Sequence, residues 1–228
     1  MTASSGLRHH YRSELEALDV DLAGMTDQVR VAIRQATEAL LSPSGRLAEK
    51  VVAADADLDA RRREVEARCV ELLTRQAPVA GELRLVLAAM RIAADLERMG
   101  DLAVHVAKIA RLRAPERAVP AALVPNFAEM GRLAESLAAA AGTVLRERDA
   151  TAARRFDEHD EEMDDLRASQ FRIIMGRNWA YGVEAAVDVA LLGRYYERFG
   201  DHAVTLAGRV VYLVTGAEPT AWHGPHTM

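Results

Sequence analysis

The sequence predicts an all-helical protein made of two related halves, and three observations carry this prediction. Half of the 228 residues are hydrophobic while only 5% are aromatic, which is typical of helices that pack through aliphatic side chains. Over long stretches, apolar residues recur every three or four positions, the spacing of a helix face buried against other helices. A short motif, Glu97 to Asp101, recurs one hundred residues later as Glu197 to Asp201.

Breaks in the apolar periodicity divide the chain into six stretches, three in each half. The first three are expected to form helices over 15–40, 47–72 and 83–104. The plan then repeats over 127–144, 156–174 and 183–214, although the turn near Asp149 has no strong helix breaker.

A segment with Pro115, Pro120 and Pro125 separates the two sets of helices. Proline interrupts helices, so this segment marks the boundary between the halves. We therefore predict a first three-helix repeat over 1–114, a proline-rich linker over 115–125, a second three-helix repeat over 126–216 and a flexible tail over 217–228.

The overall charge and the cysteine content exclude several classes of protein. A net charge of -5 gives no reason to expect nucleic acid as a partner. The single cysteine, Cys69, is expected to be buried, and it fits a reducing compartment. No uncharged apolar run approaches the roughly 20 residues that span a bilayer. We expect a cytoplasmic protein without direct membrane insertion, whose membrane association comes through protein partners.

The similarity between the halves extends beyond the five-residue motif. Ala103 and Val104 align with Ala203 and Val204 at the same offset of 100. The acidic segment Asp55 to Asp59 also has a counterpart, which lies on the second helix of the other half at an offset of 105. This agreement over two helices indicates an internal duplication.

The repeated segments place pairs of acidic residues four positions apart. Residues with this spacing share one face of a helix, so each pair puts two carboxylates about one turn apart. The four pairs are Asp55 with Asp59, Glu97 with Asp101, Asp160 with Asp164, and Glu197 with Asp201.

The acids of the third helix continue its apolar stripe, since steps of three and four from Met90 and Ala94 lead to Glu97 and Asp101. Like charges on a packed face repel and need compensation by a cation, by protonation or by basic side chains. Clustered carboxylates suit divalent or trivalent cations such as Mg, Mn, Fe or Zn. The alternatives are a solvated acidic face or an ion-pair network with nearby arginines, which are Arg61, Arg62, Arg63, Arg98, Arg194 and Arg198.

Other chemistry has less support in the sequence. His105 and His202 lie near the acids, but neither is repeated in the other half. No Glu-x-x-His pair and no glycine-rich phosphate loop is present, which argues against a di-iron oxidase and a nucleotide-binding enzyme. Gly100 and Gly200 interrupt helices and are expected to allow close helix approach. No catalytic residue is predicted.

Taken together, these motifs carry a family resemblance. The paired Glu-Arg-[Met/Phe]-Gly-Asp elements, the acids on each second helix and the segment Pro78 to Arg84 resemble the PhoU family, accessory regulators of the phosphate-specific transport system. The similarity covers about Tyr11 to Gly216, and the segment His105 to Ala110 resembles actinobacterial members.

The resemblance implies two tandem three-helix bundles, commonly in a homodimer, with multinuclear metal clusters at the bundle surface. It places the acids at the edge of the packed face, open to solvent. Asp57 departs from the family pattern, in which Glu is more usual. The implied metal ligands are Asp55, Asp59, Glu97, Asp101, Asp160, Asp164, Glu197 and Asp201.

The function implied by the resemblance is negative regulation of the phosphate-starvation response and of phosphate uptake. The protein would act as an adaptor between the ATPase subunit of the phosphate ABC transporter and a membrane sensor histidine kinase, at the inner face of the membrane. No reaction is implied. Two alternatives are a helical scaffold in which the acids pair with arginines, and a carboxylate-metal hydrolase. The hydrolase is disfavoured because no nucleophile or histidine base is shared by the halves.

Overall fold

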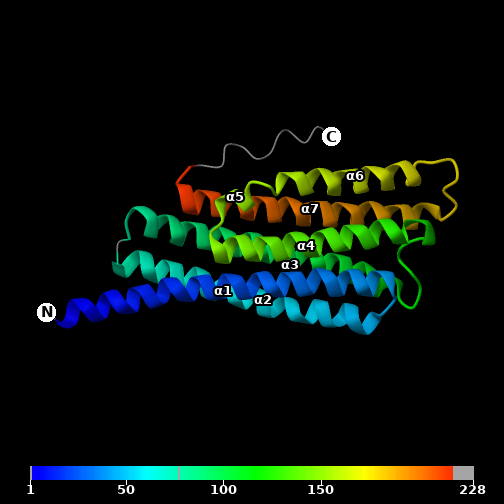
Figure 1. Ribbon diagram of the computed structural model, residues 1–228. Coiled ribbons are helices and arrows are strands. Elements are labelled where there is room, and N and C mark those ends of the chain that lie inside the picture. Colours follow the sequence, from blue (N-terminus) through cyan, green and yellow to red (C-terminus); the bar gives the residue numbers. More distant parts are fainter. Residues whose placement is uncertain (1, 77, 218–228) are drawn as a thin grey trace.

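The computed structural model describes the backbone of residues 2–76 and 78–217 and the side chains of 11–75, 78–156 and 161–217. Within these ranges every regular element is helical, which confirms the all-helical prediction (Figure 1). The elements are α1 (Thr2–Leu41), α2 (Gly45–Gln76), α3 (Ala80–Arg113), the 3-10 helix η1 (Ala121–Leu123), α4 (Val124–Glu147), α5 (Ala150–Ala153), α6 (Asp157–Ile174) and α7 (Gly182–Thr215). No helix in the described part is long and apolar enough to cross a membrane. The predicted tail lies outside the described residues from 218 onward.

The helix ends have local causes. Pro125 lies in the first turn of α4, where its missing N–H costs no hydrogen bond. The helix ends at Glu147, because the next residue, Arg148, adopts the left-handed conformation with φ 52°. Asp149 then caps α5, because its carboxylate accepts hydrogen bonds from the backbone N–H groups of Thr151 and Ala152. This cap makes the turn near Asp149 without a glycine or proline.

The first bundle consists of α1, α2 and α3, and the second of α4, α6 and α7 with the short α5 (Figure 1). The halves meet where α1 packs on α4 and α3 packs on α7. Thr37 near the end of α1 lies against Gly131 in the first half of α4, while Asp19, earlier in α1, pairs with Arg148 just after the end of α4. Arg113 at the end of α3 pairs with Asp188 near the start of α7. The facing helices are therefore antiparallel.

Buried side chains join the two halves into one core. The hydroxyl groups of Thr37 on α1 and Tyr196 on α7 are 2.7 Å apart and share a hydrogen bond. The ring of Phe127 on α4 packs against that of Tyr196, with centroids 6.0 Å apart. Tyr196 thus contacts both α1 and α4.

The two bundles differ in the length of their first helix. Helix α1 has 40 residues and α4 has 24. The early part of α1 extends to the tip of the α2–α3 hairpin, where the Tyr11 hydroxyl donates a hydrogen bond to Glu82. By contrast, Asn126 at the start of α4 donates to the carbonyl of Leu166, eight residues before the end of α6. The tip of the α6–α7 hairpin therefore extends beyond α4 (Figure 1).

Candidate carboxylate site

In the first half, α2 and α3 bring Asp55, Asp59, Glu97 and Asp101 to one edge of the bundle, where all four are half-buried. Gly100 makes this approach possible. A Cβ atom at Gly100 would lie 2.3 Å from the Leu58 Cδ2 atom and 3.8 Å from the Asp55 Oδ1 atom. The predicted close helix approach is confirmed at this glycine, which allows the acids of α2 to lie beside those of α3.

The pKa values of two of these acids are raised, partly because other negatively charged carboxylates lie close by. Burial raises the pKa of Asp55, and the neighbouring Asp101 and Asp59 raise it further. Burial likewise raises the pKa of Glu97, with a further contribution from Asp101. Each ionised carboxylate is therefore held in an environment that disfavours its charge.

Arginine compensates this cluster only in part. The Arg98 Nη1 atom lies 2.9 Å from Asp101 Oδ2, and its Nε atom lies 3.6 Å from Glu97 Oε2. Because the Arg98 side chain is 63% exposed, water screens both of these ion pairs. The charges of Arg62 and Lys108 lower the pKa of Glu97 and of Asp55, respectively, but only against larger effects that raise them, and the Arg62 guanidinium donates its 2.8 Å hydrogen bond to Glu66.

The side chains do not already surround a metal ion. Among the residues that the structure describes, no group of three His, Cys, Asp or Glu side chains has an arrangement that could hold one. The first-half acids are thus close enough to repel one another without converging on a common point.

The second half differs at the equivalent positions, because Glu197 is buried and paired with two arginines. The Arg167 Nη1 atom lies 2.8 Å from Glu197 Oε1, and the Arg194 Nη1 atom lies 2.7 Å from Glu197 Oε2. Glu197 therefore matches the alternative prediction of an ion-pair network.

The other acids of the second half are less closely packed. Asp164 is exposed, Asp201 is half-buried, and the side chain of Asp160 lies outside the described residues. A Cβ atom at Gly200 would meet its nearest neighbours, on Leu137 and Met163, at 3.7 and 3.9 Å. These are ordinary contact distances, so Gly200 does not mark the tight approach seen at Gly100.

Sequence reasoning missed Arg167 as a partner of Glu197. One signal was available, because Arg167 is the counterpart of Arg62 at the offset of 105 that relates the second helices. Arg194 was among the arginines considered, and its ion pair with Glu197 is confirmed.

The two histidines have other partners at their Nδ1 atoms. His105 Nδ1 lies 2.7 Å from the backbone carbonyl of Asp101, and its ring stacks at a tilt on Tyr195. His202 Nδ1 lies 3.5 Å from the buried carboxylate of Asp95, which also pairs with Arg209. Asp95 thus joins α3 to α7 and has a structural role.

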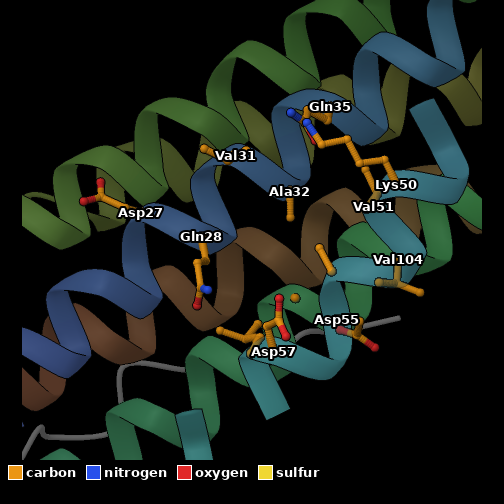
Figure 2. Close-up of a pocket in the computed structure, with 13 residues that line it drawn as sticks. Asp27, Gln28, Val31, Ala32, Gln35, Lys50, Val51, Asp55, Asp57 and Val104 are labelled. Atoms are coloured by element: carbon orange, nitrogen blue, oxygen red, sulfur yellow. The ribbon is translucent and has the colours of Figure 1, made fainter. Parts of the chain in front are cut away.

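A pocket of about 320 Å³ lies beside the first-half acids (Figure 2). Apolar side chains from α1, α2 and α3 form much of its wall, including Val31, Val51 and Val104. Asp55 and Gly100 also line it. The carboxylate cluster therefore adjoins a concave surface.

The fold and the site together define a class of protein. It is a duplicated helical bundle in which carboxylates gather between the second and third helices of a bundle. The described site contains no pair of side chains that could act as nucleophile and base. The chain belongs to the PhoU family, because the PhoU domain matches residues 22–110 and 127–210. The family consists of accessory and regulatory proteins rather than enzymes, and this chain is an accessory protein of that kind.

Named relatives match along nearly their whole length. The chain is 44% identical over 213 residues to the phosphate-specific transport system accessory protein PhoU homolog 2 of Mycobacterium tuberculosis, covering 93% of this chain and 100% of the relative. It is 42% identical to PhoU homolog 1 of Mycobacterium leprae, covering 93% and 96%. These relatives confirm the predicted resemblance to actinobacterial members.

Two solved structures share the fold. PhoU from Pseudomonas aeruginosa superimposes with a TM-score of 0.82 at 26% identity, covering 91% of this chain and 100% of that one. The phosphate transport system regulatory protein PhoU from Streptococcus pneumoniae gives the same score and identity, covering 91% and 98%.

Proposed function

We propose that the protein is a negative regulator of the phosphate-starvation response and of phosphate uptake. The observation that carries this proposal is the match along the entire length of a phosphate-specific transport system accessory protein at 44% identity. Agreement over both halves means that the complete duplicated fold is retained, rather than one shared bundle.

The proposed mechanism is that of an adaptor. The protein links the ATPase subunit of the phosphate ABC transporter to a membrane sensor histidine kinase, at the inner face of the membrane, and acts there as a homodimer. Long helices with many exposed charged side chains offer extended docking surfaces. An adaptor needs such surfaces and no catalytic groups.

The first-half cluster is proposed to bind a metal cation through Asp55, Asp59, Glu97 and Asp101. Support comes from the mutual repulsion that raises the pKa of Asp55 and Glu97 and from the partial compensation by Arg98. Carboxylate oxygens are suitable donors for Mg, Mn, Fe or Zn. A bound cation would supply positive charge that offsets the repulsion among these carboxylates.

The second-half cluster, Asp160, Asp164, Glu197 and Asp201, is proposed as the weaker metal site. Two arginines already neutralise the buried Glu197. A cation would have to displace both ion pairs before Glu197 became available as a ligand. The duplication thus supplies two related sites of unequal affinity.

A deletion strain tests the regulatory proposal. Deleting the gene should leave phosphate-starvation genes active in high phosphate, and the intact gene in trans should restore repression. Normal repression in the deletion strain would contradict the proposal and favour the scaffold alternative.

Metal binding is tested on untagged protein by elemental analysis and calorimetric titration. Asp101→Asn should abolish the tighter binding event, while its matched control Asp201→Asn should leave that event unchanged. If neither the native protein nor the control binds metal, the acids serve only as a charged surface. If metal-loaded protein hydrolyses a phosphate ester and Glu97→Ala does not, the hydrolase alternative is revived.

A further inference from the structure

The tip of the α6–α7 hairpin carries an exposed apolar surface. Seven of the twelve large hydrophobic side chains that are exposed in the described part of the chain lie between residues 171 and 191. Five of them surround the turn between the helices and are called the apolar tip here: Phe171, Ile173, Met175, Tyr181 and Val183. Met175 and Val183 are 82% and 81% exposed. Exposed apolar side chains gathered in one region are typical of surfaces that meet a protein partner or a membrane.

The apolar tip is also basic, although the chain as a whole carries a net charge of -5. No Asp or Glu occurs from Leu166 to Val183, whereas Arg167, Arg172 and Arg177 do. The next acid, Glu184, forms an ion pair with Arg113. Arg167 is paired with Glu197, while Arg172 and Arg177 are exposed beside the apolar tip. The partner of this surface should therefore be apolar and anionic.

The α6–α7 hairpin exposes apolar residues at positions that are less exposed in the α2–α3 hairpin. Val183 and Val187 correspond to Leu83 and Leu87 in the first half, at the offset of 100. Leu83 and Leu87 are half-buried in the bundle that contains the longer α1, whereas Val183 and Val187 are exposed. The second half therefore leaves apolar residues open to solvent at positions that the first half partly buries.

The turn that presents the apolar tip is ordered by its own contacts. The Trp179 indole N–H donates a 2.8 Å hydrogen bond to the carbonyl of Gly182. The Trp179 and Tyr181 rings meet edge to face with centroids 5.0 Å apart. Tryptophan and tyrosine are the side chains that favour the boundary between lipid headgroups and acyl chains.

We propose that the apolar tip docks directly on an anionic lipid surface. The apolar side chains would enter the headgroup region, while Arg172 and Arg177 contact lipid phosphates. Charge favours lipid over a symmetric contact between two copies of the tip, because that contact would bring like charges together. The contact is peripheral and goes beyond the proposed function, in which the membrane is reached through protein partners.

Vesicle flotation with the full-length protein tests the proposal. The protein should bind vesicles of phosphatidylglycerol and phosphatidylcholine, bind pure phosphatidylcholine weakly, and dissociate as salt is raised. The double variant Arg172→Ala/Arg177→Ala should lower the partition coefficient roughly 30-fold. Val183→Glu should also release the protein. The matched control is Val79→Glu, since Val79 is 72% exposed at the opposite hairpin tip.

Fluorescence gives a second measurement. The chain has two tryptophans, so Trp222→Phe leaves Trp179 as the sole reporter. Brominated lipids should quench Trp179 when the protein binds, and Val183→Glu should abolish the quenching.

Three outcomes would overturn the proposal: no partition into anionic vesicles, an equal effect of Val79→Glu, or binding that is insensitive to the arginine variants. A change in sedimentation velocity caused by Val183→Glu, without any vesicle binding by the native protein, would assign the surface to a second copy. The vesicle and sedimentation measurements do not depend on gene repression in the deletion strain. The lipid-docking proposal can therefore be disproved while the regulatory proposal stands, and the reverse also holds.

Discussion

Glu97 and Glu197 occupy the same position in the repeated motif, but their neighbours give the two carboxylates opposite effects on stability. Glu97 lies among other acids, and Glu197 lies between two arginines. In metal-free buffer, Glu97→Gln should raise the free energy of unfolding by up to about 0.5 kcal/mol, because it relieves like-charge repulsion. Glu197→Gln should lower it by about 1–2 kcal/mol, because the charge-assisted hydrogen bond from Arg167 is weakened and the ion pair with Arg194 is lost.

Urea unfolding in the presence of a chelator measures both changes. The comparison is internally controlled, because the same substitution is made at equivalent positions. Equal effects of the two variants would show that the halves are electrostatically alike.

Buried protonated groups make the stability depend on pH in the alkaline range. Burial raises the pKa of the Cys69 thiol from 9.0 to about 11. The folded state therefore favours the protonated thiol, and this contribution is complete below pH 9. It is lost as the pH rises from about 9 to about 11, at a cost of up to about 3 kcal/mol. Tyr11, with its pKa raised to about 12, adds to the loss.

Urea midpoints at pH 8 and pH 10.5 check this prediction. The native protein should lose stability over this interval, and Cys69→Ala should lose less, because the raised thiol pKa no longer contributes and the pKa values of Tyr11 and Tyr196 lie higher still. The Cys69 thiol should also react slowly with a thiol reagent at pH 8 in the folded state. Rapid labelling without denaturant would contradict its burial.

At this scale the sequence identifies the acids but not all of their partners. The four-residue spacing and the apolar phase place Asp55, Asp59, Glu97 and Asp101 on facing helices, because both follow from helix geometry. The pairing of Arg167 with Glu197 joins residues thirty positions apart. This pairing depends on how α6 and α7 are aligned along their lengths. The apolar spacing within one helix does not specify that alignment.

At the scale of the helices, the packing of α1 on α4 depends on Gly131. A Cβ atom there would lie 2.3 Å from the Thr37 Cγ2 atom and 3.0 Å from its Cβ atom. Thr37 is buried, and its hydroxyl bonds the carbonyl of Ile33 and the Tyr196 hydroxyl, so it has no room to move. Gly131→Ala should lower the free energy of unfolding by about 1–3 kcal/mol through overpacking.

Gly200→Ala provides the matched control. The added methyl group would meet its neighbours at ordinary contact distances. Alanine favours the helix by about 1 kcal/mol relative to glycine, so this variant should be neutral or more stable. Destabilisation of both variants to the same extent in urea would show that contact distance does not decide the outcome.

The helix boundaries show where sequence patterns stop being informative. The predicted first helix began near residue 15, whereas α1 begins at Thr2. Apolar periodicity reveals only helix that is packed on a core, and the stretch before Leu15 has few regularly spaced apolar residues. The short α5 was also missed, because the stop signal of α4 is the left-handed conformation of Arg148 and the start signal of α5 is a single aspartate.

At the scale of the whole molecule, the two bundles should unfold together. Tyr196 is fully buried against residues of both halves, and Asp95 and Arg113 pair with α7 across the boundary. Separating the bundles would expose this surface, so neither half should remain folded alone.

Two probes test this cooperativity. Trp179 fluorescence, in a Trp222→Phe background, reports on the second half, and the accessibility of Cys69 reports on the first. Both should give the same urea midpoint. Two resolved transitions would show that the bundles are independent domains.

The unequal lengths of α1 and α4 give the molecule a direction. An exact duplication with antiparallel halves would look the same after a half-turn, and its two ends would be interchangeable. Here one end is closed by α1 and the other is open. The ends are separated by roughly the length of the 34-residue α7, about 51 Å. The two ends of this nearly symmetric fold therefore differ. A partner that binds one end also sets the direction in which the other end points.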